Sequence, residues 1–342
     1  MKRVLFVRQD NDGDVLLAGP AVRAVAAGAD HLTLLCGPRG RAAAELLPGV
    51  DEVMVWRAPW IDPEPGPVDR EDVARIEAEL RGRAFDEAIV LTSFHQSPLP
   101  MALVLRLAGV PTVAAISDDY PGSLLDVRHR VTGEVHEVQR GLSLVSTLGY
   151  ALPATDDGRL RVRRRSGARP ALDGAYVVVH PGASVPARAW DPERNAALVE
   201  ALRVEGRSVV VTGSPAERPL TSRAAGPARD GVHDLGGGTD LAGLAEVLAG
   251  AEAVVVGNTG PAHLAAAVGT PVVSLFAPTV PEARWRPWRV AHELLYVEVP
   301  CAGCRARICP VEGHPCLGGV EVEDVVGALE RLAPLRVGAG VE

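Results

Sequence analysis

Short apolar runs alternate with stretches of helical periodicity along most of the chain. In the first half, an apolar run at 3–7 leads through a polar turn at 10–14 into small and aliphatic residues at helical spacing over 15–29. Strands that alternate with helices predict a parallel sheet covered on both faces. Further apolar runs lie at 31–37, 51–56, 85–91 and 112–117, interleaved with helical patterns at 39–50 and 98–110.

The alternation starts again after a polar, turn-rich stretch at 153–174, which we interpret as an interdomain linker. We therefore predict an α/β protein with two Rossmann-like, doubly wound lobes that face each other across a cleft. Ligands of such sheets bind outside the carboxyl ends of the strands. The expected parts are an acceptor-binding domain at 1–160, a nucleotide-sugar-binding domain at 161–325 and a C-terminal tail at 326–342 that packs back on the first domain.

The charge balance argues against nucleic-acid binding. The 342 residues carry a formal net charge of −8, whereas nucleic-acid binders present a basic stripe or patch. The opening apolar run is too short for the core of a secretory signal, and no apolar stretch is long enough to span a bilayer. We expect a cytoplasmic protein. Residues 58–75 are Pro-rich and acidic and predict a loop.

The segment that follows the apolar run 253–257 predicts an anion site. Asn258, Thr259 and Gly260 lead into a helix that we expect to begin at Pro261, a residue suited to the first helical turn. Free backbone N–H groups and the positive end of the helix dipole would hold a diphosphate there. His263 lies in the first turn, near enough to donate to the same oxygen; its alternative is a structural histidine.

These residues belong to a longer segment, GNTGPAHLAAAVGTPVVSLFAPT, that closely resembles the donor-site signature of glycosyltransferase family 9, the heptosyltransferase family of GT-B fold. Three further segments are similar to motifs of that family and follow in its order: RQDNDGDVLLAGPAVRAV, VVVHPGASVPARAW and DLGGGTDLAGLAEVLAGAEAVVVGNTG. The resemblance runs from about residue 3 to 325. It implies a glycosyltransferase with ADP-heptose favoured as the donor and a glycan or small molecule as the acceptor. A lipid-linked acceptor would bring peripheral membrane contact.

The resemblance also implies roles for single residues. Asp14 matches the acidic residue held to deprotonate the acceptor hydroxyl. Asn258 departs from the family, which usually has Asp before the Thr-Gly pair, so the donor sugar is open to change. The donor contacts implied by the match are Ser184 beside Ala183 at the phosphates, Arg188 in place of a phosphate-binding Lys, Glu217 at the ribose, and Thr259, Gly260 and His263 at the diphosphate and sugar.

The proposed chemistry needs a stabilised diphosphate and an acceptor oxygen relieved of its proton. Arg188, His263 and the helix N-terminus at Pro261 could stabilise the diphosphate, and we identify no Asp-x-Asp pair placed to hold a divalent cation for the phosphates. Transfer without a metal or other cofactor is the prediction. A single base on the face opposite the leaving group implies single displacement, with inversion at the anomeric carbon.

Asp10, Asp12 and Asp14 are expected in one loop at the carboxyl end of the first strand, with Asp10 and Asp12 as candidates for the acceptor side. Carboxylates crowded in this way can raise the pKa of one of them toward that of a useful base. The alternative is that Asp10 and Asp12 only make the turn and Asp14 caps the helix, which would stabilise the fold by about 1 kcal/mol.

Four cysteines crowd together near the C-terminus, at Cys301, Cys304, Cys309 and Cys316. With His314 nearby they offer the ligand types and the close first pair of a structural zinc site, although the later spacings are irregular. Packed thiols and a local disulfide are the alternatives. For the whole protein, the competing functions are a nucleotide-sugar epimerase of GT-B-like fold and a nucleotide-sugar-binding protein without transfer activity.

Overall fold

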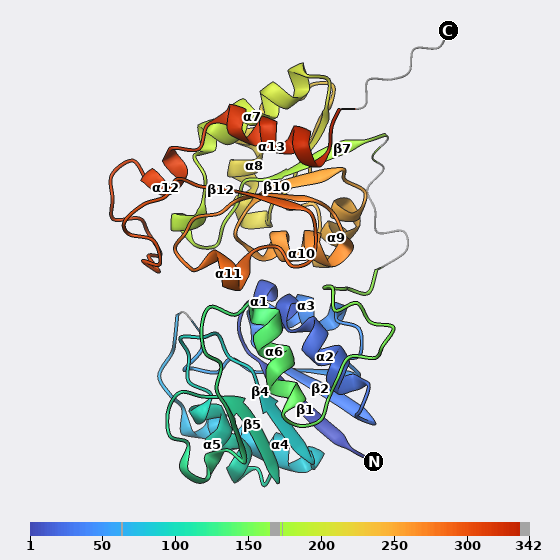
Figure 1. Ribbon diagram of the computed structural model, residues 1–342, viewed down its shortest axis with the longest axis vertical. Coiled ribbons are helices and arrows are strands. Elements are labelled where there is room, and N and C mark those ends of the chain that lie inside the picture. Colours follow the sequence, from blue (N-terminus) through green and yellow to red (C-terminus); the bar gives the residue numbers. More distant parts are fainter. Residues whose placement is uncertain (63, 165–171, 173, 336–342) are drawn as a thin grey trace. The chain divides into compact units, whose positions relative to one another are not determined.

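The computed structural model describes residues 1–62, 64–164, 172 and 174–335. Their contacts divide the chain into two compact units, Met1–Arg163 and Arg164–Glu342. The roles predicted for the two domains are not decided by this division and stay predictions. Each unit is a parallel sheet with helices packed on it (Figure 1).

The first unit contains a sheet in the order β3-β2-β1-β4-β5-β6, with every described neighbour parallel. Its strands are β1 (Arg3–Arg8), β2 (His31–Cys36), β3 (Glu52–Val55), β4 (Glu87–Val90), β5 (Thr112–Ile116) and β6 (Val127–His129). Its helices are α1 (Asp12–Leu17), α2 (Gly19–Ala26), α3 (Arg41–Leu46), α4 (Arg70–Arg83), α5 (Leu99–Leu107) and α6 (Glu137–Ser146), with short 3-10 turns at Pro38–Gly40 and Gly122–Leu124.

The central strand β1 is apolar throughout its middle because helices cover both of its faces. Leu5 and Val7 share a buried cluster with Ile76 of α4 and Leu105 of α5. Side chains alternate along a strand, so Val4 and Phe6, which are also fully buried, point to the opposite face. The helices α2 and α6 lie side by side (Figure 1).

The second unit repeats this plan with the order β12-β11-β10-β7-β8-β9. Its strands are β7 (Tyr176–His180), β8 (Ser208–Val211), β9 (Val232–Asp234), β10 (Ala253–Gly257), β11 (Val272–Leu275) and β12 (His292–Leu295). Its helices are α7 (Pro192–Val204), α8 (Arg218–Ala225), α9 (Leu241–Ala249), α10 (Gly260–Val268), α11 (Glu282–Trp285), α12 (Pro315–Gly318) and α13 (Val322–Leu332), with 3-10 turns at Pro186–Arg188 and Pro215–Glu217.

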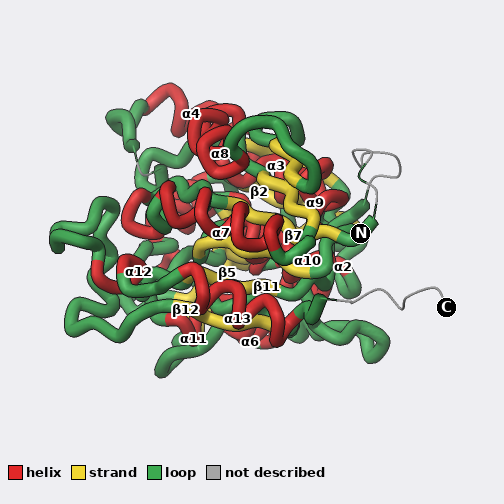
Figure 2. The backbone as a smooth tube through the Cα atoms, turned by 90° about the horizontal axis from the view of Figure 1, so that it is seen from above, coloured by secondary structure: helices red, strands yellow, loops and turns green. Residues whose placement is uncertain are grey.

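The helix α13 belongs to the second unit. Its buried residues Val325 and Leu329 lie in one cluster with Val177 of β7 and Leu198 of α7, and Figure 2 shows α7 and α13 next to each other. Most of the described part of the expected tail is therefore helix packed on the second sheet. Residues 336–342, which complete that tail, lie outside the described residues, as do 165–171 and 173 of the expected linker.

Numbered within each unit, both sheets have the strand order 3-2-1-4-5-6. This is the Rossmann order, in which the strand order reverses between strands 1 and 4 and a crevice opens at their carboxyl ends. The switch points are β1/β4 in the first unit and β7/β10 in the second. The two doubly wound sheets predicted from the alternation are confirmed.

Three local predictions are wrong. The single helix expected over 15–29 is two helices, α1 and α2, which meet at Ala18. The loop expected over 58–75 ends early, because α4 begins at Arg70 with the Asp69 side chain accepting from the Glu71 N–H. The third is the turn expected over 10–14, which is shorter because α1 begins at Asp12. Asp12 and Asp14 therefore stand on a helix, and only Asp10 lies in the preceding loop.

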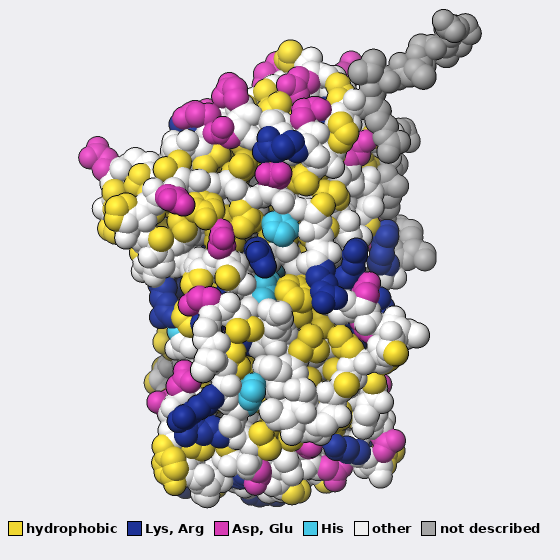
Figure 3. Space-filling view, viewed as in Figure 1, with side chains coloured by type: hydrophobic (Ala, Val, Ile, Leu, Met, Phe, Trp, Pro, Cys, Tyr) yellow, Lys and Arg dark blue, Asp and Glu magenta, His cyan; other side chains and the backbone are white. Residues whose placement is uncertain are grey.

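On the face drawn in Figure 3, acidic and basic side chains are interspersed over both units. Such mixing differs from the single-sign stripe of a nucleic-acid binder. Among the described residues, no helix combines the length and the apolarity that crossing a bilayer requires.

Candidate active site

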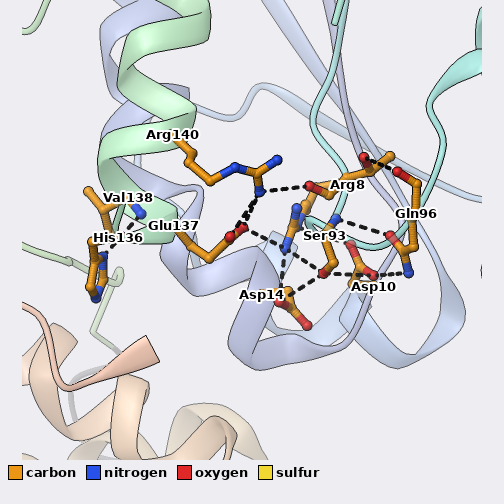
Figure 4. Close-up of polar contacts among 10 residues, drawn as sticks. Arg8, Asp10, Asp14, Ser93, Gln96, His136, Glu137, Val138 and Arg140 are labelled. Atoms are coloured by element: carbon orange, nitrogen blue, oxygen red, sulfur yellow. Dashed lines mark hydrogen bonds and ion pairs between the residues drawn. The ribbon is translucent and has the colours of Figure 1, made fainter. Parts of the chain in front are cut away.

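The switch point of the first unit gathers charged and polar side chains from four segments. Arg8 is the last residue of β1 and Asp10 follows it, Asp14 lies in the first turn of α1, and Ser93 follows β4. A fourth segment, α6, brings in Glu137 at its first position. Figure 4 shows these side chains pointing toward one another. We call Arg8, Asp10, Asp14, Ser93, Gln96, Glu137 and Arg140 the β1/β4 cluster.

Arg8 is the centre of the β1/β4 cluster, and only 1% of its side chain is exposed. Its Nη2 donates to Asp14 Oδ1 over 2.8 Å and lies 3.3 Å from Ser93 Oγ. Its Nε lies 3.2 Å from Asp10 Oδ2. A buried guanidinium is tolerated only when carboxylates compensate for its lost hydration. One cation therefore ties two carboxylates together.

A second ion pair comes from α6. Arg140 Nη1 donates to both carboxylate oxygens of Glu137 over 2.8 Å, and Glu137 Oε2 lies 3.9 Å from Arg8 Nη2. The helix is started by His136, whose Nδ1 accepts from the Val138 N–H (Figure 4). Burial raises the pKa of Glu137, against the opposing effect of Arg8 and Arg140.

Asp14 is the member of the cluster with one carboxylate oxygen, Oδ2, that makes no polar contact among the described residues. Its side chain is 20% exposed, and within the described residues all of its polar contacts involve Oδ1. The alternative in which Asp14 caps the helix is wrong, because Asn11 occupies the N-cap position and Asp14 is a helical residue. An acidic residue in the first turn is favoured by the helix dipole.

The other two aspartates behave differently from each other. Asp12 Oδ1 accepts from the Ala43 N–H over 2.9 Å, which ties α1 to α3. Asp10 is almost fully buried, with Gln96 Nε2 donating to its Oδ1 over 2.7 Å. Burial raises the pKa of Asp10 to about 6; Arg8 opposes this and the charge of Asp14 adds to it. The three aspartates thus separate into one that joins helices, one buried beside Arg8 and one that is open.

The switch point of the second unit is built from backbone rather than from charged side chains. Thr259 is the N-cap of α10 and Gly260 its first residue, while His263, 5% exposed, lies in the first turn. The backbone N–H groups of this turn point out of the carboxyl end of β10 and form the kind of site that holds anions. The structure thus brings Thr259, Gly260 and His263 together at one helix end.

Asn258 has a structural reason to be an amide. Its Nδ2 donates to the Ala277 carbonyl over 3.0 Å, and the side chain is 6% exposed. An aspartate in this position would set a carboxylate oxygen against that carbonyl. The Oδ1 of Asn258 is buried, and within the described residues it has no hydrogen-bond partner. Because an unpaired buried acceptor is costly, it is a candidate contact for a ligand hydroxyl.

Arg188 stands next to this helix start. A Cβ at Gly257, the end of β10, would lie 2.9 Å from the Arg188 backbone oxygen, so only glycine allows the loop to pass so close. Arg188 Nε donates to Thr279 Oγ1 over 3.3 Å. Ser184 lies in the loop after β7 and is exposed. The two donor-side residues predicted on this loop are thus placed at the carboxyl end of the sheet.

Glu217 packs against the start of the same loop. A Cβ at Gly182 would lie 2.1 Å from Glu217 Oε1, so the carboxylate occupies the space that glycine leaves. Glu217 Oε2 accepts from the Ser214 N–H over 2.7 Å in a capping box. The predicted ribose carboxylate therefore already has a local partner, and its position is fixed.

The four cysteines line one hollow, together with His314. All four thiols are free, which contradicts a local disulfide. Among the described residues, no group of three or more His, Cys, Asp or Glu side chains is placed to hold a metal ion. The prediction of structural zinc at Cys301, Cys304, Cys309 and Cys316 therefore gains no support. Cys316 is buried in the core of the second unit, as the packed-thiol alternative expects.

The cysteine segment also contacts the loop that carries Arg188. The Ala187 N–H donates to the Arg307 carbonyl over 3.0 Å, and His314 Nε2 lies 3.1 Å from the Ala187 carbonyl. Arg305 N–H donates to the Thr279 carbonyl over 3.0 Å. These hydrogen bonds hold in place both the loop that carries Arg188 and Thr279, the residue to which Arg188 donates.

Sequence reasoning missed much of the β1/β4 cluster: Arg8, Ser93, Gln96, Glu137 and Arg140. Two signals were available. Arg8 is a charge that closes an otherwise apolar strand, and Glu137 and Arg140 stand three residues apart, on one face of a helix. Neither signal predicts that the end of β1 and the start of α6 lie next to each other.

The family comparison covers most of the chain. Residues 73–314 match the model of glycosyltransferase family 9 (heptosyltransferase). Lipopolysaccharide heptosyltransferase 1 of Pseudomonas aeruginosa is 32% identical over 259 residues, 72% of this chain and 71% of that protein. Lipopolysaccharide heptosyltransferase 3 of Escherichia coli K12 is 30% identical over 215 residues, 58% of this chain and 60% of its own length. The match therefore spans less than two thirds of the latter relative.

Solved structures agree on the fold. The glycosyl transferase family 9 protein of Veillonella parvula superposes with a TM-score of 0.81 at 18% identity over 97% of both chains. The E. coli ADP-heptose lps heptosyltransferase II gives 0.74 at 21% identity over 97% of this chain and 98% of that one. UDP-GlcNAc 2-epimerase of Methanocaldococcus jannaschii reaches 0.53 at 10% identity over 98% and 94%. All three are likenesses of fold.

Proposed function

Because the chain belongs to glycosyltransferase family 9 and is a glycosyltransferase of GT-B fold, we propose that it transfers a heptose from ADP-heptose to a hydroxyl of a glycan acceptor. The named activities of the P. aeruginosa and E. coli relatives support a heptose as the sugar. ADP-heptose is named with the E. coli heptosyltransferase II. The acceptor would be an envelope glycan, and a lipid-linked one would bring the protein to a membrane surface.

The observation that carries the proposal is the placement of Asp14. It lies at the switch point of the first sheet, with Oδ1 held by the buried Arg8 and Oδ2 without a polar contact among the described residues. A carboxylate fixed by one oxygen can take a proton with the other, as a general base must. We assign Asp14 as the base that deprotonates the acceptor hydroxyl.

The leaving diphosphate would be held in the second unit. Arg188 supplies a positive charge, the first turn of α10 supplies backbone N–H groups, and His263 lies in that turn. Such donors stabilise charge that develops on the departing phosphate oxygen. Asn258 Oδ1 would accept from a sugar hydroxyl, and Glu217 and Ser184 complete the donor contacts at the ribose and the phosphates. Charge stabilisation by these groups supports transfer without a divalent metal.

The reaction follows as one displacement. The acceptor oxygen forms a bond to the anomeric carbon as the bond from that carbon to the phosphate oxygen breaks. Asp14 takes the hydroxyl proton, and ADP leaves with the electron pair of the broken bond. Since attack comes from the face opposite the leaving group, the configuration at the anomeric carbon inverts.

The test is ADP release from ADP-heptose with and without a heptose-accepting glycan. Acceptor-dependent ADP release and an inverted linkage by NMR of the product support the proposal. An isomerised donor would indicate an epimerase, and donor binding with neither product would indicate a binding protein. Release that stops after chelation and returns with added metal would contradict the metal-independent mechanism. UDP-GlcNAc is the matched donor control.

A further inference from the structure

Arg8 offers one positive charge to two carboxylates. Its Nη2 donates to Asp14 Oδ1 over 2.8 Å, and its Nε lies 3.2 Å from Asp10 Oδ2. Both contacts are to a guanidinium that is 1% exposed, so water does not replace either of them. Any change in the charge of Asp10 is therefore felt by Asp14 through Arg8, at short range and with little screening.

The Ser93 hydroxyl also lies between the two carboxylates, and it has a single hydrogen to donate. Its Oγ lies 3.4 Å from Asp10 Oδ1 and 3.5 Å from Asp14 Oδ1. A hydroxyl donates one hydrogen, so it serves one carboxylate at a time. The loop is held by Gln96, whose Oε1 accepts from the Ser93 N–H over 3.1 Å while its Nε2 donates to Asp10. Asp10 and Asp14 thus share the one hydrogen of Ser93 and the one positive charge of Arg8 (Figure 4).

Asp10 lies among side chains from several segments, and its backbone carbonyl lies beside Gly37 and Gly40 of the turn after β2. The charged and titratable groups facing it are Arg8 from β1, Asp14 from α1 and Glu137 from α6, with Arg140 behind Glu137. From the loop after β4 come the neutral Ser93 and Gln96. The combined effect of this setting is that burial raises the pKa of Asp10 to about 6. Its charge therefore changes within the range in which enzymes work.

We propose that Asp10 is a positioning residue for Asp14: its ionisation draws the Ser93 hydrogen away from Asp14 Oδ1 and divides the charge of Arg8 between the two carboxylates, and its protonation leaves both to Asp14. The inference deepens the proposed function and rests on it, since Asp14 matters to turnover only if it is the base. With Asp10 protonated, Asp14 is held tightly as an anion and accepts a proton less readily. With Asp10 ionised, Asp14 is the stronger base, so turnover rises through the ionisation of Asp10.

The first experiment compares kcat against pH, with ADP-heptose and the acceptor saturating, for the wild type, Asp10→Asn and Asp86→Asn. Asp86 is the matched control, because its carboxylate accepts from the Arg3 N–H at the other end of β1. The wild type and Asp86→Asn are expected to gain roughly tenfold in kcat across pH 6, the effect of coupling by about one unit. Asp10→Asn is expected to stay at the low-pH rate without this step. A step that persists in Asp10→Asn overturns the proposal.

The second experiment needs no turnover, so it separates failure of this inference from failure of the proposed function. Aspartate is labelled with 13C at the carboxyl, and the Asp14 resonance is assigned by its loss in Asp14→Asn. We expect the Asp14 shift to report an inflection near pH 6 that disappears in Asp10→Asn and shrinks in Ser93→Ala. An Asp14 resonance without that inflection in the wild type overturns the proposal, even if Asp10→Asn fails to fold.

Discussion

The two units have the same strand order, yet their switch points are built from different chemistry. At β1/β4, charged side chains converge on the buried guanidinium of Arg8. At β7/β10, the crevice presents the backbone of a helix start and the neutral amide of Asn258. Arg188 is there too, but it is held from a separate loop.

This difference shows that the strand order determines where a crevice forms, whereas the side chains at the strand ends determine its chemistry. A cluster of buried charges responds strongly to gain or loss of a proton, because each charge is compensated only by its neighbours. A helix N-terminus keeps its partial charge at every pH and favours an anion. This difference supports the proposed division, with proton transfer at the first switch point and the diphosphate at the second.

The largest effect is expected for Asp14→Asn, which tests the difference between the two switch points. If the first switch point handles the proton, kcat should fall by about 10²- to 10⁴-fold, the usual worth of a general base. Affinity for ADP in the second unit should not change. The free energy of unfolding in urea should fall by about 1–3 kcal/mol, because Asn keeps an oxygen for Arg8 Nη2 but not the charge that compensates the buried guanidinium. Calorimetry with ADP beside the rate assay checks both. A variant with near-wild-type turnover contradicts the assignment of the base.

Arg8→Met tests whether the cluster depends on its central cation. Removing Arg8 leaves Asp10, Asp14 and Glu137 close together without it, so we expect a loss of about 3–5 kcal/mol in the free energy of unfolding. Urea denaturation measures it. The matched control is Arg331→Met, which breaks the exposed pair with Glu293 in the second unit and should cost below about 1 kcal/mol. Equal losses of unfolding free energy in the two variants would contradict the claim that the cluster depends on Arg8 more than an exposed ion pair depends on its cation.

The two switch points should also respond to pH in opposite directions. The pKa of Asp10 is raised from 3.8 to about 6, so its neutral form is favoured in the fold and stability falls as pH rises from about 4 to 6. Burial lowers the pKa of His180, at the end of β7, so its contribution is lost as pH falls below 6.5.

The measurement is urea unfolding of the wild type and Asp10→Asn at several pH values. The variant should gain up to about 3 kcal/mol on the wild type between pH 4 and 7, the linkage value of roughly two units. A constant difference over this range would mean that Asp10 keeps one charge state throughout.

In the second unit, Arg188→Ala should weaken ADP-heptose binding by about 10- to 100-fold, the value of a charge-assisted bond of roughly 1.5–3 kcal/mol. The dependence of kcat on pH should keep its shape, because that shape is set in the first unit. Arg188→Lys is the matched control, since it keeps the charge and loses only the forked geometry. Unchanged donor affinity in Arg188→Ala would remove Arg188 from the site.

The smallest effect is expected for Asn258→Asp. The new carboxylate would face the Ala277 carbonyl in a buried position, and stability should fall by about 1–3 kcal/mol at neutral pH. The loss should lessen on acidification, because a protonated Asp can donate to that carbonyl. Thermal unfolding at pH 5 and pH 8 checks this. If Asn258→Asp is as stable as the wild type at pH 8, the Ala277 contact does not explain the amide.

Much of the fold could be predicted because its signals are local. The apolar run that becomes β1 and the Thr-Gly-Pro start of α10 act through neighbours in the chain, and both appear close to where they were expected. Local signals are also ambiguous. The start of α1 at Asp12 was missed because Asp and Gly are typical both of a turn and of a helix start.

The residues of the donor side were suggested by the order of motifs, and their placement at the carboxyl end of the second sheet follows from the parallel topology. What the sequence determined by itself is therefore the pair of doubly wound sheets and the strand ends at which polar residues gather. The tertiary structure decided which charges meet. Glu137 and Arg8 are far apart in the chain, and only the packing of α6 beside α2 brings them within 3.9 Å. The same packing leaves the side chain of Asp10 7% exposed and that of Asp14 20% exposed, and burial makes each of these charges depend on its neighbours.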